Sequence, residues 1–419
     1  MRPMTTTKAT RKGQWLVLVA AFLGWMFDGL EMGIFPLVAR PALQDMMPAM
    51  AEMKPDQFVG LWMSYITALF LVGAALGGLS FGWIGDRLGR VRAMTLSILT
   101  YSVFTGLCYF AREPWHLGML RFVAAFGMGG EWSLGVALVM EAWPAEKRPL
   151  LAGVIGAAAN VGFALIAVVG LYFKVTQDSW RWVMVAGAAP ALLALGIQVF
   201  VPESQRWKES VRSGASQPVR EIFTSSLRNA TLLAIAFASI ALIGTWGSVQ
   251  WLPLWADQLT QGKMPTAKAA TQIVSGVGAI IGCFVGPWFG GRFGRRPAYF
   301  GLCLLSLIFC GLLFRTIHEY GTLFLFLVGI VGGVTAAFYG WLPLYLPELF
   351  PTRVRATGQG LSFNFGRILA AVGALMQGQL VSYYDGSYAK AGAVITLIYL
   401  LGMVLIWFAP ETKGKPLPE

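Results

Sequence analysis

Residues 85–93 read GDRLGRVRA, and the stretch 290–298, which reads GGRFGRRPA, repeats that pattern 205 positions later. A second pair of stretches matches at nearly the same offset, because EAWPAEKRPLLAG at 141–153 and ELFPTRVRATGQG at 348–360 lie 207 positions apart. Two independent motifs that recur at nearly one offset are hard to obtain by chance. The second half of the chain is therefore predicted to be a structural copy of the first.

Long apolar segments surround these motifs. Hydrophobic residues make up 56% of the 419 residues and charged residues only 12%, whereas soluble domains carry about 25% charged residues. A helix needs about 20 apolar residues to cross about 30 Å of hydrocarbon. The sequence therefore predicts an all-α membrane protein with twelve transmembrane helices, near residues 15–39, 58–82, 93–111, 117–140, 150–173, 181–200, 229–256, 268–290, 298–315, 321–346, 356–382 and 389–409.

The longest loop divides these helices into two groups of six. It is polar and basic, and it lies between the sixth and seventh predicted helices. We therefore expect a cytoplasmic arm at 1–14, an N-terminal six-helix bundle at 15–200, a cytoplasmic linker at 201–228, a C-terminal six-helix bundle at 229–409 and a cytoplasmic tail at 410–419.

The positive charges indicate the orientation in the membrane. The loops on the side of both termini carry 21 of the 32 Lys and Arg residues, and the opposite loops and helix ends carry nine. By the positive-inside rule both termini are predicted to be cytoplasmic, in a multi-pass protein of the cell (inner) membrane. The net charge of +12 is then explained by the bilayer as partner, and no nucleic acid is expected.

The loop after the second predicted helix resembles the signature loop of the major facilitator superfamily, and with six plus six helices the resemblance covers nearly the whole chain. The residues that carry it are Gly82, Gly85, Asp86, Arg87, Gly89, Arg90 and Arg92. The resemblance implies two pseudo-symmetric six-helix bundles, transport by alternating access and a monomer. The stretches PESQRW (202–207) and PETKG (410–414) resemble sugar-porter tags, which indicate a branch and not a substrate.

Other stretches indicate a branch within that family. DGLE at 28–31 and the run RFVAAFGMGGEWSLGVALVMEAWP at 121–144 resemble proton symporters of metabolites such as sialate, lactate and aromatic acids. The fifth predicted helix lacks the G-P-x-x-G-G element of drug antiporters, which lowers the efflux alternative. The seventh keeps only Gln250 of the Q-Q-x-x-G element of sugar porters, which disfavours a hexose.

Five charged side chains fall inside the predicted membrane spans, namely Asp28, Glu31, Arg121, Glu131 and Arg367. Charges at this depth are costly, and those that face a cavity are usually functional. At a rise of about 1.5 Å per residue, Asp28 and Arg367 lie near the midplane, where carriers of this kind bind their substrate.

The acidic residues are candidates for proton coupling. Asp28 and Glu31 are three residues apart and share a helix face, so in a desolvated cavity one of them is expected to hold a proton. The resemblance implies that Glu31 alternates between a proton and Arg121. A permanent ion pair between these two residues is the structural alternative. Glu131 is either a second proton site or the partner of an arginine across the cavity.

Arg367 is the main indication of the substrate. A guanidinium at the midplane suits a carboxylate in bidentate geometry, which favours an organic anion over a neutral sugar. The alternative is that Arg367 neutralises Glu131 or Asp28 without touching a ligand. The repeat offset of 207 places Asn160 in the position that corresponds to Arg367. Further candidates for the substrate cavity are Asn364, Gln250, Trp246, Tyr339 and Gln359.

The repeated motifs are predicted to form a gate at the cytoplasmic end. Charge clusters of this kind hold one side closed and must break for release. We expect Asp86 to pair with groups of neighbouring helices beside Arg87 and Arg90, and we expect two matching clusters, in which Glu141 pairs with Arg148 and Glu348 pairs with Arg355.

The sequence contains no nucleotide-binding loop, metal-ligand cluster or nucleophile elbow, so no enzyme activity, cofactor or metal is expected. We predict a secondary active transporter that carries out proton-coupled symport of a small organic acid, a monocarboxylate such as lactate or sialate, by alternating access. The alternatives are a carrier of sugars, polyols or aromatic acids with the same fold and, less favoured, a nutrient sensor that does not transport.

Overall fold

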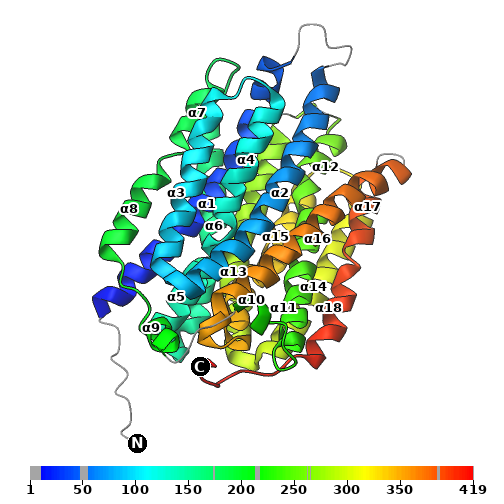
Figure 1. The fold of residues 1–419 in the computed structure, drawn as a ribbon. Coiled ribbons are helices and arrows are strands. Elements are labelled where there is room, and N and C mark those ends of the chain that lie inside the picture. The colour runs from blue at the N-terminus through cyan, green and yellow to red at the C-terminus, as the bar shows by residue number, and fades with distance from the viewer. Residues whose placement is uncertain are drawn as a thin grey trace, which may run out of the picture.

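The computed structural model describes residues 11–47, 55–172, 175–212, 218–261, 263–264, 266–384 and 387–418. Within these ranges the secondary structure is helical and no strand is present, which confirms the prediction of an all-α protein (Figure 1). The first half contains α1 (Arg11–Asp45), α2 (Pro55–Leu88), α3 (Arg90–Leu107), α4 (Pro114–Gly129), α5 (Glu131–Ala142), α6 (Arg148–Tyr172), α7 (Trp180–Ala186) and α8 (Pro190–Phe200).

Two short helices, α9 (Gln205–Arg212) and α10 (Pro218–Glu221), lie in the predicted linker. The second half contains α11 (Arg228–Gly247), α12 (Leu252–Leu259), α13 (Thr266–Phe293), α14 (Arg295–Thr316), α15 (Thr322–Leu349), α16 (Arg355–Tyr383), α17 (Tyr388–Ile395) and α18 (Ile398–Leu405). Single 3₁₀ turns are η1 (Cys108–Phe110), η2 (Ala145–Lys147), η3 (Val249–Trp251), η4 (Thr352–Val354) and η5 (Ile406–Phe408).

The predicted spans correspond to helices, but not all of them are continuous or apolar. Among the described residues, ten helical stretches are long and apolar enough to cross a membrane, and Trp180–Ala194 is a shorter apolar stretch. The predicted fourth span consists of α4 and α5, which meet at Gly130. The eleventh predicted span, α16, has 29 residues but is not one of the ten stretches, because polar residues such as Gln359, Asn364 and Arg367 interrupt its apolar character.

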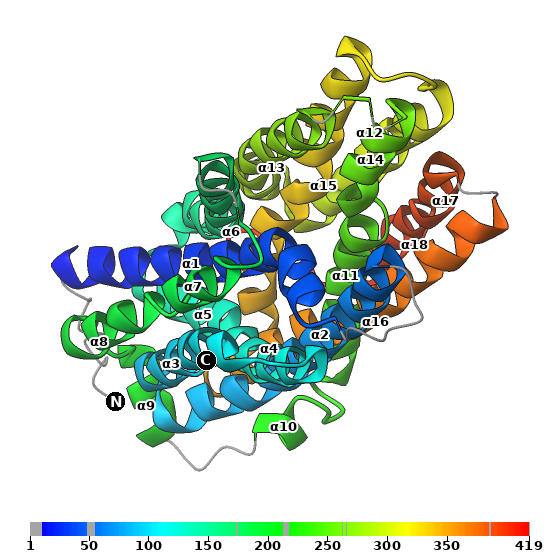
Figure 2. The same cartoon turned by 90° about the horizontal axis from the view of Figure 1, so that it is seen from above.

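The helices pack within each half and meet along two lines (Figure 2). In the first half α1 packs on α5 and α6, and α2 packs on α4. In the second half α11 packs on α16, and α13 packs on α15. The halves touch where α2 packs on α16 and where α6 packs on α13 and α15. Residues of α1, α5 and α16 therefore line a common centre.

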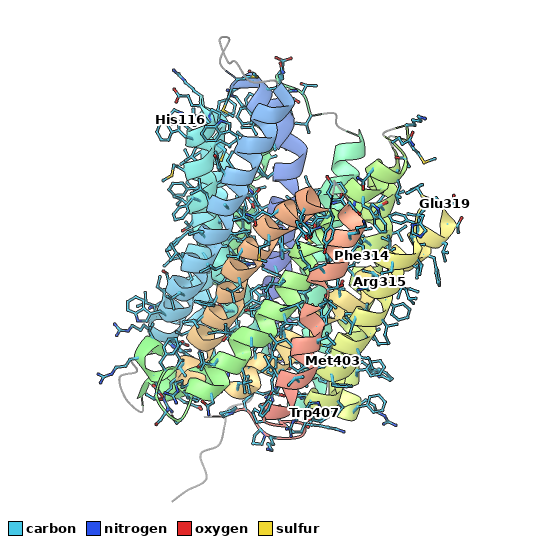
Figure 3. All side chains as sticks on the ribbon, turned by 90° about the vertical axis from the view of Figure 1, so that its right-hand side faces the viewer. His116, Phe314, Arg315, Glu319, Met403 and Trp407 are labelled. Atoms are coloured by element: carbon cyan, nitrogen blue, oxygen red, sulfur yellow. The ribbon has the colours of Figure 1, made fainter. Side chains whose placement is uncertain are left out.

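The two ends of the bundle differ. The start of α1 and the C-terminal end of the chain lie at the same end, beside α9 (Figure 1). His116, in contrast, lies at the opposite end (Figure 3). The helix pairs α2–α3 and α13–α14 turn at Gly89 and Gly294, whose φ angles of 111° and 107° fall in the region that favours glycine. Both turns belong to the repeated basic motif.

Candidate functional site

Two buried carboxyl groups adjoin each other at the centre of the bundle. Asp28 lies in α1 and Glu131 is the first residue of α5, and they are 0% and 1% exposed. Gly24 leaves room for Glu131, since a Cβ at that position would lie 1.8 Å from Glu131 Oε1. The two carboxyl groups interact with each other, and no donor group of the other described residues forms a hydrogen bond to their oxygens. Such a pair can hold a proton between its members.

Arg367 interacts with this pair from α16. Its side chain is buried, and its guanidinium interacts electrostatically with Asp28. Nη1 donates to Asn364 Oδ1 over 2.9 Å, and the guanidinium carbon lies 5.2 Å from the centre of the Phe363 ring. The arrangement fits both predicted roles of Arg367, because the guanidinium can bind an anion or balance Asp28.

Asn364 holds Arg367 in place. The Nδ2 group of this fully buried residue donates to the carbonyl oxygens of Gly129 and Gly360, each over 2.9 Å. Gly129 belongs to α4 and Gly360 to α16, so the amide of Asn364 joins the two halves of the protein. Its remaining oxygen accepts from Arg367. Asn364 therefore positions Arg367, in addition to being a predicted substrate-binding residue.

Glu31 forms a buried ion pair with Arg121, which joins α1 to α4. Thr105 Oγ1 also donates to Glu31 Oε1, over 3.1 Å. The guanidinium of Arg121 lies against the rings of Phe35 and Phe70, 4.8 Å from each ring centre. The predicted pair is present, and its geometry is compatible with either alternative, a proton-controlled contact or a permanent bridge.

Two further polar residues predicted from the sequence lie in the helices that contribute to this centre, α15 and α16. Gln359 is fully buried in α16, and neither atom of its amide has a hydrogen-bond partner among the described residues. Tyr339 is partly buried in α15, where it interacts electrostatically with Arg367. Gln377, which lies farther along α16, is also buried with an unbonded amide within the described part of the chain. Unbonded buried amides are costly, which makes them candidates for contact with a ligand or water.

The other predicted substrate residues lie in different environments. Asn160 of α6 is partly buried, and its Nδ2 contacts Cys283 Sγ of α13 at 3.6 Å. Trp246 is partly buried near the end of α11, whereas Gln250 is exposed in η3. The structure thus does not gather the whole predicted set into one cluster. Arg367, Asn364 and Tyr339 form its central part, and Gln359 lies one turn after Arg355 near the start of α16.

Aromatic rings close the centre toward the end that carries the termini. Trp132 of α5 and Phe363 of α16 stack with their ring centres 4.2 Å apart and an angle of 17° between their planes. Trp25 of α1 contacts both rings. Because Trp132 follows Glu131 and Phe363 carries Arg367 on its face, the stack lies directly beside the charged residues.

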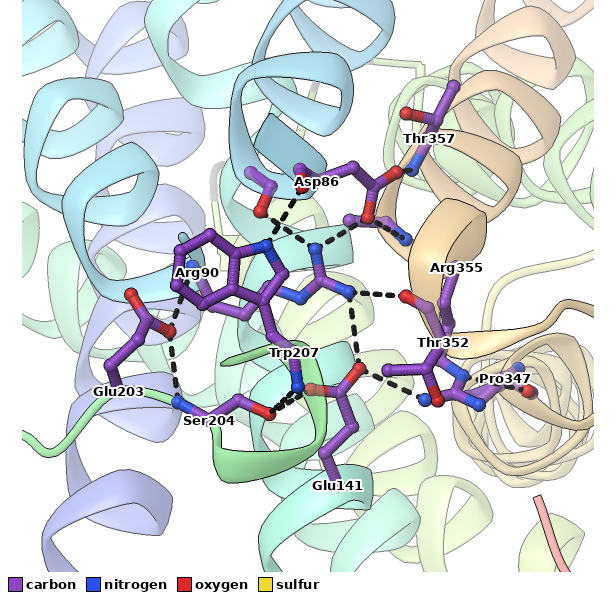
Figure 4. A network of polar contacts seen from close by, with 12 residues as sticks. Asp86, Arg90, Glu141, Glu203, Ser204, Trp207, Pro347, Thr352, Arg355 and Thr357 are labelled. Carbon is purple, nitrogen blue, oxygen red and sulfur yellow. Dashed lines mark hydrogen bonds and ion pairs between the residues drawn. The ribbon is translucent and has the colours of Figure 1, made fainter. Parts of the chain in front are cut away.

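A network of charges joins the halves at the end of the bundle that carries the termini (Figure 4). Arg355 Nη1 donates to Glu141 Oε1 over 3.0 Å, and Arg90 Nη2 donates to the same oxygen over 3.2 Å. Arg90 also donates to the carbonyl oxygen of Thr352, over 2.8 Å. Ser204 donates to the other oxygen of Glu141. The network therefore includes both halves and the linker.

The residues of the expected cluster of Glu348 and Arg355 have other partners in the structure. Glu348 instead accepts two hydrogen bonds from Arg295, from Nε over 3.0 Å and from Nη2 over 2.7 Å. Arg355 crosses to Glu141 because the start of α16 packs against the first half. Arg295 corresponds to Arg90 at the repeat offset of 205, so the pair Arg295–Glu348 is the counterpart of Arg90–Glu141 within the second half.

Asp86 has no counterpart in the second half, and its partner helix explains why. Asp86 accepts the backbone N–H groups of Ala356 and Thr357, over 3.3 and 2.8 Å, at the start of α16. In the second half Gly291 replaces Asp86, and a Cβ there would lie 2.9 Å from Pro149 at the start of α6. Proline has no N–H group to donate, so a carboxylate there would lack the donor that Ala356 provides to Asp86.

The remaining gate candidates lie at the same end of the bundle. Arg87 is exposed, and its guanidinium carbon lies 4.6 Å from the centre of the Trp83 ring. Arg148 is buried at the first position of α6. Neither residue belongs to the ion pairs that join Glu141 to the second half.

Two glutamates of this region were not predicted as functional residues. Glu203 accepts the backbone N–H groups of Arg90, Val91 and Ser204, and Glu411 accepts those of Arg295, Arg296, Thr412 and Lys413. Each carboxylate thus caps the helix that follows a glycine turn. The signal was present in the sequence, since PES and PET occur 208 positions apart, close to the repeat offset.

The two caps differ electrostatically. Burial raises the pKa of Glu203 above its usual value, even though backbone N–H groups favour its ionised form. Partial burial also acts to raise the pKa of Glu411, but four backbone N–H groups outweigh it, and the pKa of Glu411 lies below its usual value. The contributions of Glu203 and Glu411 to stability are therefore expected to change with pH in opposite directions.

Two helical halves, buried charges at the centre and a charge network at one end define a multi-pass membrane transport protein. The comparisons with known proteins give the family. The model of the Major Facilitator Superfamily matches residues 15–374. The chain belongs to this superfamily, which confirms the predicted fold class. It is a transporter of metabolites and not an enzyme.

Relatives and solved structures agree with this assignment. A protein of Haemophilus influenzae whose name describes metabolite transport is 30% identical over 98% of this chain and 100% of its own. The cis,cis-muconate transport protein of Acinetobacter baylyi is 28% identical over 83% of this chain and 84% of its own. A structure of the proton:xylose symporter XylE superposes with a TM-score of 0.78 and 19% identity, over 96% of this chain and 97% of that one.

Proposed function

We propose that this transporter carries a small organic acid together with a proton into the cell by alternating access. The observation that carries the proposal is the central cluster, in which the buried guanidinium of Arg367 interacts with Asp28, beside a second carboxyl group at Glu131. One positive group and two adjoining acids, to which no donor group of the other described residues forms a hydrogen bond, provide sites for an anion and for a proton. Our first substrate class is a monocarboxylate such as lactate or sialate.

Arg367 is the proposed anion site. Its Nη1 is held by Asn364, and the rest of the planar guanidinium can bind a carboxylate in bidentate geometry. Tyr339 and Gln359 add polar groups, and the stack of Trp132 and Phe363 supplies an apolar surface for the body of the substrate. Transport of cis,cis-muconate, itself an organic anion, by a relative supports an acidic substrate.

The acids of α1 and α5 are the proposed proton sites. When Arg121 is paired with Glu31, as it is here, a proton on Glu31 would release the arginine. A proton shared by Asp28 and Glu131 would be displaced or retained according to whether an anion sits on Arg367. Both arrangements couple protonation to substrate binding through charge, and the variants Glu31→Gln and Glu131→Gln distinguish them.

The charge network of Glu141, Arg90, Arg355 and Asp86 is the proposed gate. It joins the halves at the end with the termini, which we place in the cytoplasm of a cell with the protein in its inner membrane, because the basic loops lie there. The two predicted bundles, 15–200 and 229–409, would then move against each other as the network breaks and forms. We propose that one monomer carries out this cycle.

An aromatic acid is the second candidate substrate. The observation in its favour is the ring pair Trp132–Phe363 beside Arg367, because aromatic substrates stack on such surfaces. A sugar or polyol is less favoured, since a neutral ligand would leave the guanidinium of Arg367 without an anion. The likeness to XylE at 19% identity concerns the fold.

The proposal is tested by measuring the internal pH of proteoliposomes that contain a trapped pH dye. Lactate, sialate, an aromatic acid and xylose are added outside in turn, and protein-free liposomes serve as the control for passive entry of acid. Acidification beyond the control with one of the acids supports proton-coupled anion import and names its class. Uptake of labelled xylose without acidification by any of the acids would overturn the proposal.

A further inference from the structure

A large apolar groove lies on the outer side of the second half, away from the central cluster. It has a volume of about 830 Å³, and α13, α14 and α15 line it with apolar side chains and glycines only. These helices lie at one edge of the bundle (Figure 2), and all three are among the stretches that can cross a membrane. Val277, Ile281 and Phe326 of its lining are 54%, 59% and 63% exposed. The groove therefore opens toward lipid.

Glycines create the depth of this groove. A Cβ at Gly278 would lie 2.0 Å from the carbonyl oxygen of Gly329, and a Cβ at Gly282 would lie 1.9 Å from that of Gly333, so α13 and α15 touch through their backbones. This close packing of small residues is typical of membrane helices. On the opposite wall, a Cβ at Gly301 of α14 would meet no atom within 4 Å. A side chain placed there would enter the groove without a clash.

Positive charge lies at one end of the groove. Arg292 is exposed and follows the lining residue Val285 by seven positions, which places it on the same face of α13. Lys413 is also exposed, and its Nζ donates to the carbonyl oxygen of Arg292 over 2.8 Å. This is the end of the bundle that carries the termini. An apolar groove that ends at two cations is complementary to a molecule with an acyl chain and an anionic headgroup.

We propose that the groove binds an anionic phospholipid of the leaflet on the side of the termini. Its acyl chain lies along Val277, Ile281 and Gly301, and its phosphate contacts Arg292 and Lys413. The site rests on the membrane location of the chain and is independent of the transported substrate. Since α13 also packs on α6 of the other half, the lipid contacts a helix that forms part of the interface between the halves.

Native mass spectrometry tests the proposal on full-length protein released from bilayers of phosphatidylglycerol or phosphatidylethanolamine. Wild type should retain phosphatidylglycerol in preference to phosphatidylethanolamine. Gly301→Leu should retain less lipid than wild type, because the leucine side chain narrows the groove where the acyl chain lies. Gly276→Leu is the matched control, because Gly276 lies on α13 outside the lining, a Cβ there also meets no atom within 4 Å, and lipid retention should be unchanged. Arg292→Gln should lose the preference for phosphatidylglycerol but keep the acyl contact.

Several outcomes would overturn this assignment. Equal retention of lipid by wild type and Gly301→Leu would show that the lipid binds elsewhere. Equal retention of both lipids by wild type, with no effect of Arg292→Gln, would remove the anionic headgroup from the site. A wild-type mass of two protein copies that Gly301→Leu reduces to one would identify the groove as an interface between copies. Melting temperatures of all variants, compared with wild type, separate loss of lipid from loss of folding.

Discussion

Arg355 donates to Glu141 over 3.0 Å, although 214 positions separate the two residues in the chain. Both side chains are buried, and Glu141 also forms an ion pair with Arg90, which belongs to the same half as Glu141. Removal of one partner from a buried ion pair costs about 3 kcal/mol or more, because the other charge is left without compensation. The bond between Arg355 and Glu141 therefore stabilises contact between the halves at the end with the termini.

We predict that Glu141→Gln weakens this contact. At the interface the backbone N–H groups of Ala356 and Thr357 donate hydrogen bonds to Asp86. In the variant these N–H groups should exchange with deuterium faster than in wild type, as measured in a peptide that covers residues 352–360. Hydrogen exchange followed by mass spectrometry provides the measurement.

Glu348→Gln is the matched control for that variant. It breaks the corresponding pair with Arg295, which lies within the second half, so it should lower the melting temperature without faster exchange in the same peptide. Unchanged exchange in Glu141→Gln, or the same increase in both variants, would contradict a gating role for Glu141.

Arg367→Ala should weaken binding of the transported acid by about 10- to 100-fold, since hydrogen bonds to charged groups contribute about 1.5–3 kcal/mol. Arg367→Lys should be intermediate, because lysine keeps the charge and lacks the planar fork. Isothermal titration calorimetry measures the affinity, and melting temperatures verify folding. If Arg367→Ala bound the acid as tightly as wild type, Arg367 would be a partner of Asp28 and not an anion site.

The helices, the repeat and the intramembrane charges could be predicted because each leaves a local pattern in the sequence. Apolar length indicates a span, and a charge within that span is exceptional wherever it falls. The ion pair of Glu31 with Arg121 was predicted only through the resemblance to a known family, since 90 positions separate these residues. The break between α4 and α5 at Gly130 was not predicted, because glycine is tolerated inside membrane helices.

The partners in the charge network could not be predicted in the same way. The sequence places Glu141, Glu348, Arg295 and Arg355 at one end of the bundle, but which arginine reaches which glutamate depends on how the halves pack. Repeat symmetry is satisfied by Arg90–Glu141 with Arg295–Glu348, which the structure contains, but equally by the expected Glu141–Arg148 with Glu348–Arg355, so it does not choose between them. The contact of Arg355 with Glu141 depends on α16 packing against the first half, which the internal repeat does not encode.

The proton site is located by comparing two conservative variants. Glu31→Gln should keep counterflow exchange of the substrate and lose accumulation driven by a pH gradient, because glutamine cannot exchange a proton. Glu131→Gln should show the same loss if the pair Asp28–Glu131 holds a coupled proton. Both are measured with labelled substrate in proteoliposomes. Retained accumulation in Glu31→Gln would transfer the coupling role to Asp28 or Glu131 and leave Glu31–Arg121 as a permanent bridge.

The caps Glu203 and Glu411 should affect stability with opposite dependence on pH. The pKa of Glu411 lies below its usual value of about 4.3, so its stabilisation is present above that pH and is lost as the pH falls through the lowered pKa. The pKa of Glu203 is raised, so its contribution is fully present below about pH 4.3 and is lost as the pH rises through the raised pKa.

Glutamine variants of the two caps, measured by thermal unfolding between pH 4 and pH 8, test this difference. Glu411→Gln should have a lower melting temperature than wild type at pH 8, and the deficit should begin to shrink toward pH 4, because Glu411 of the unfolded chain binds a proton there before the native cap does. Glu203→Gln should improve relative to wild type as the pH rises, because it removes a carboxylate that is costly to ionise when buried. Glutamine keeps one accepting oxygen and loses the other, which accepts from Val91 in Glu203 and from Arg296 in Glu411. Both variants therefore lose an acceptor, and the change of their melting temperatures with pH reports the charge. If the melting temperatures of both variants, relative to wild type, changed in the same direction with pH, burial would not distinguish the two caps.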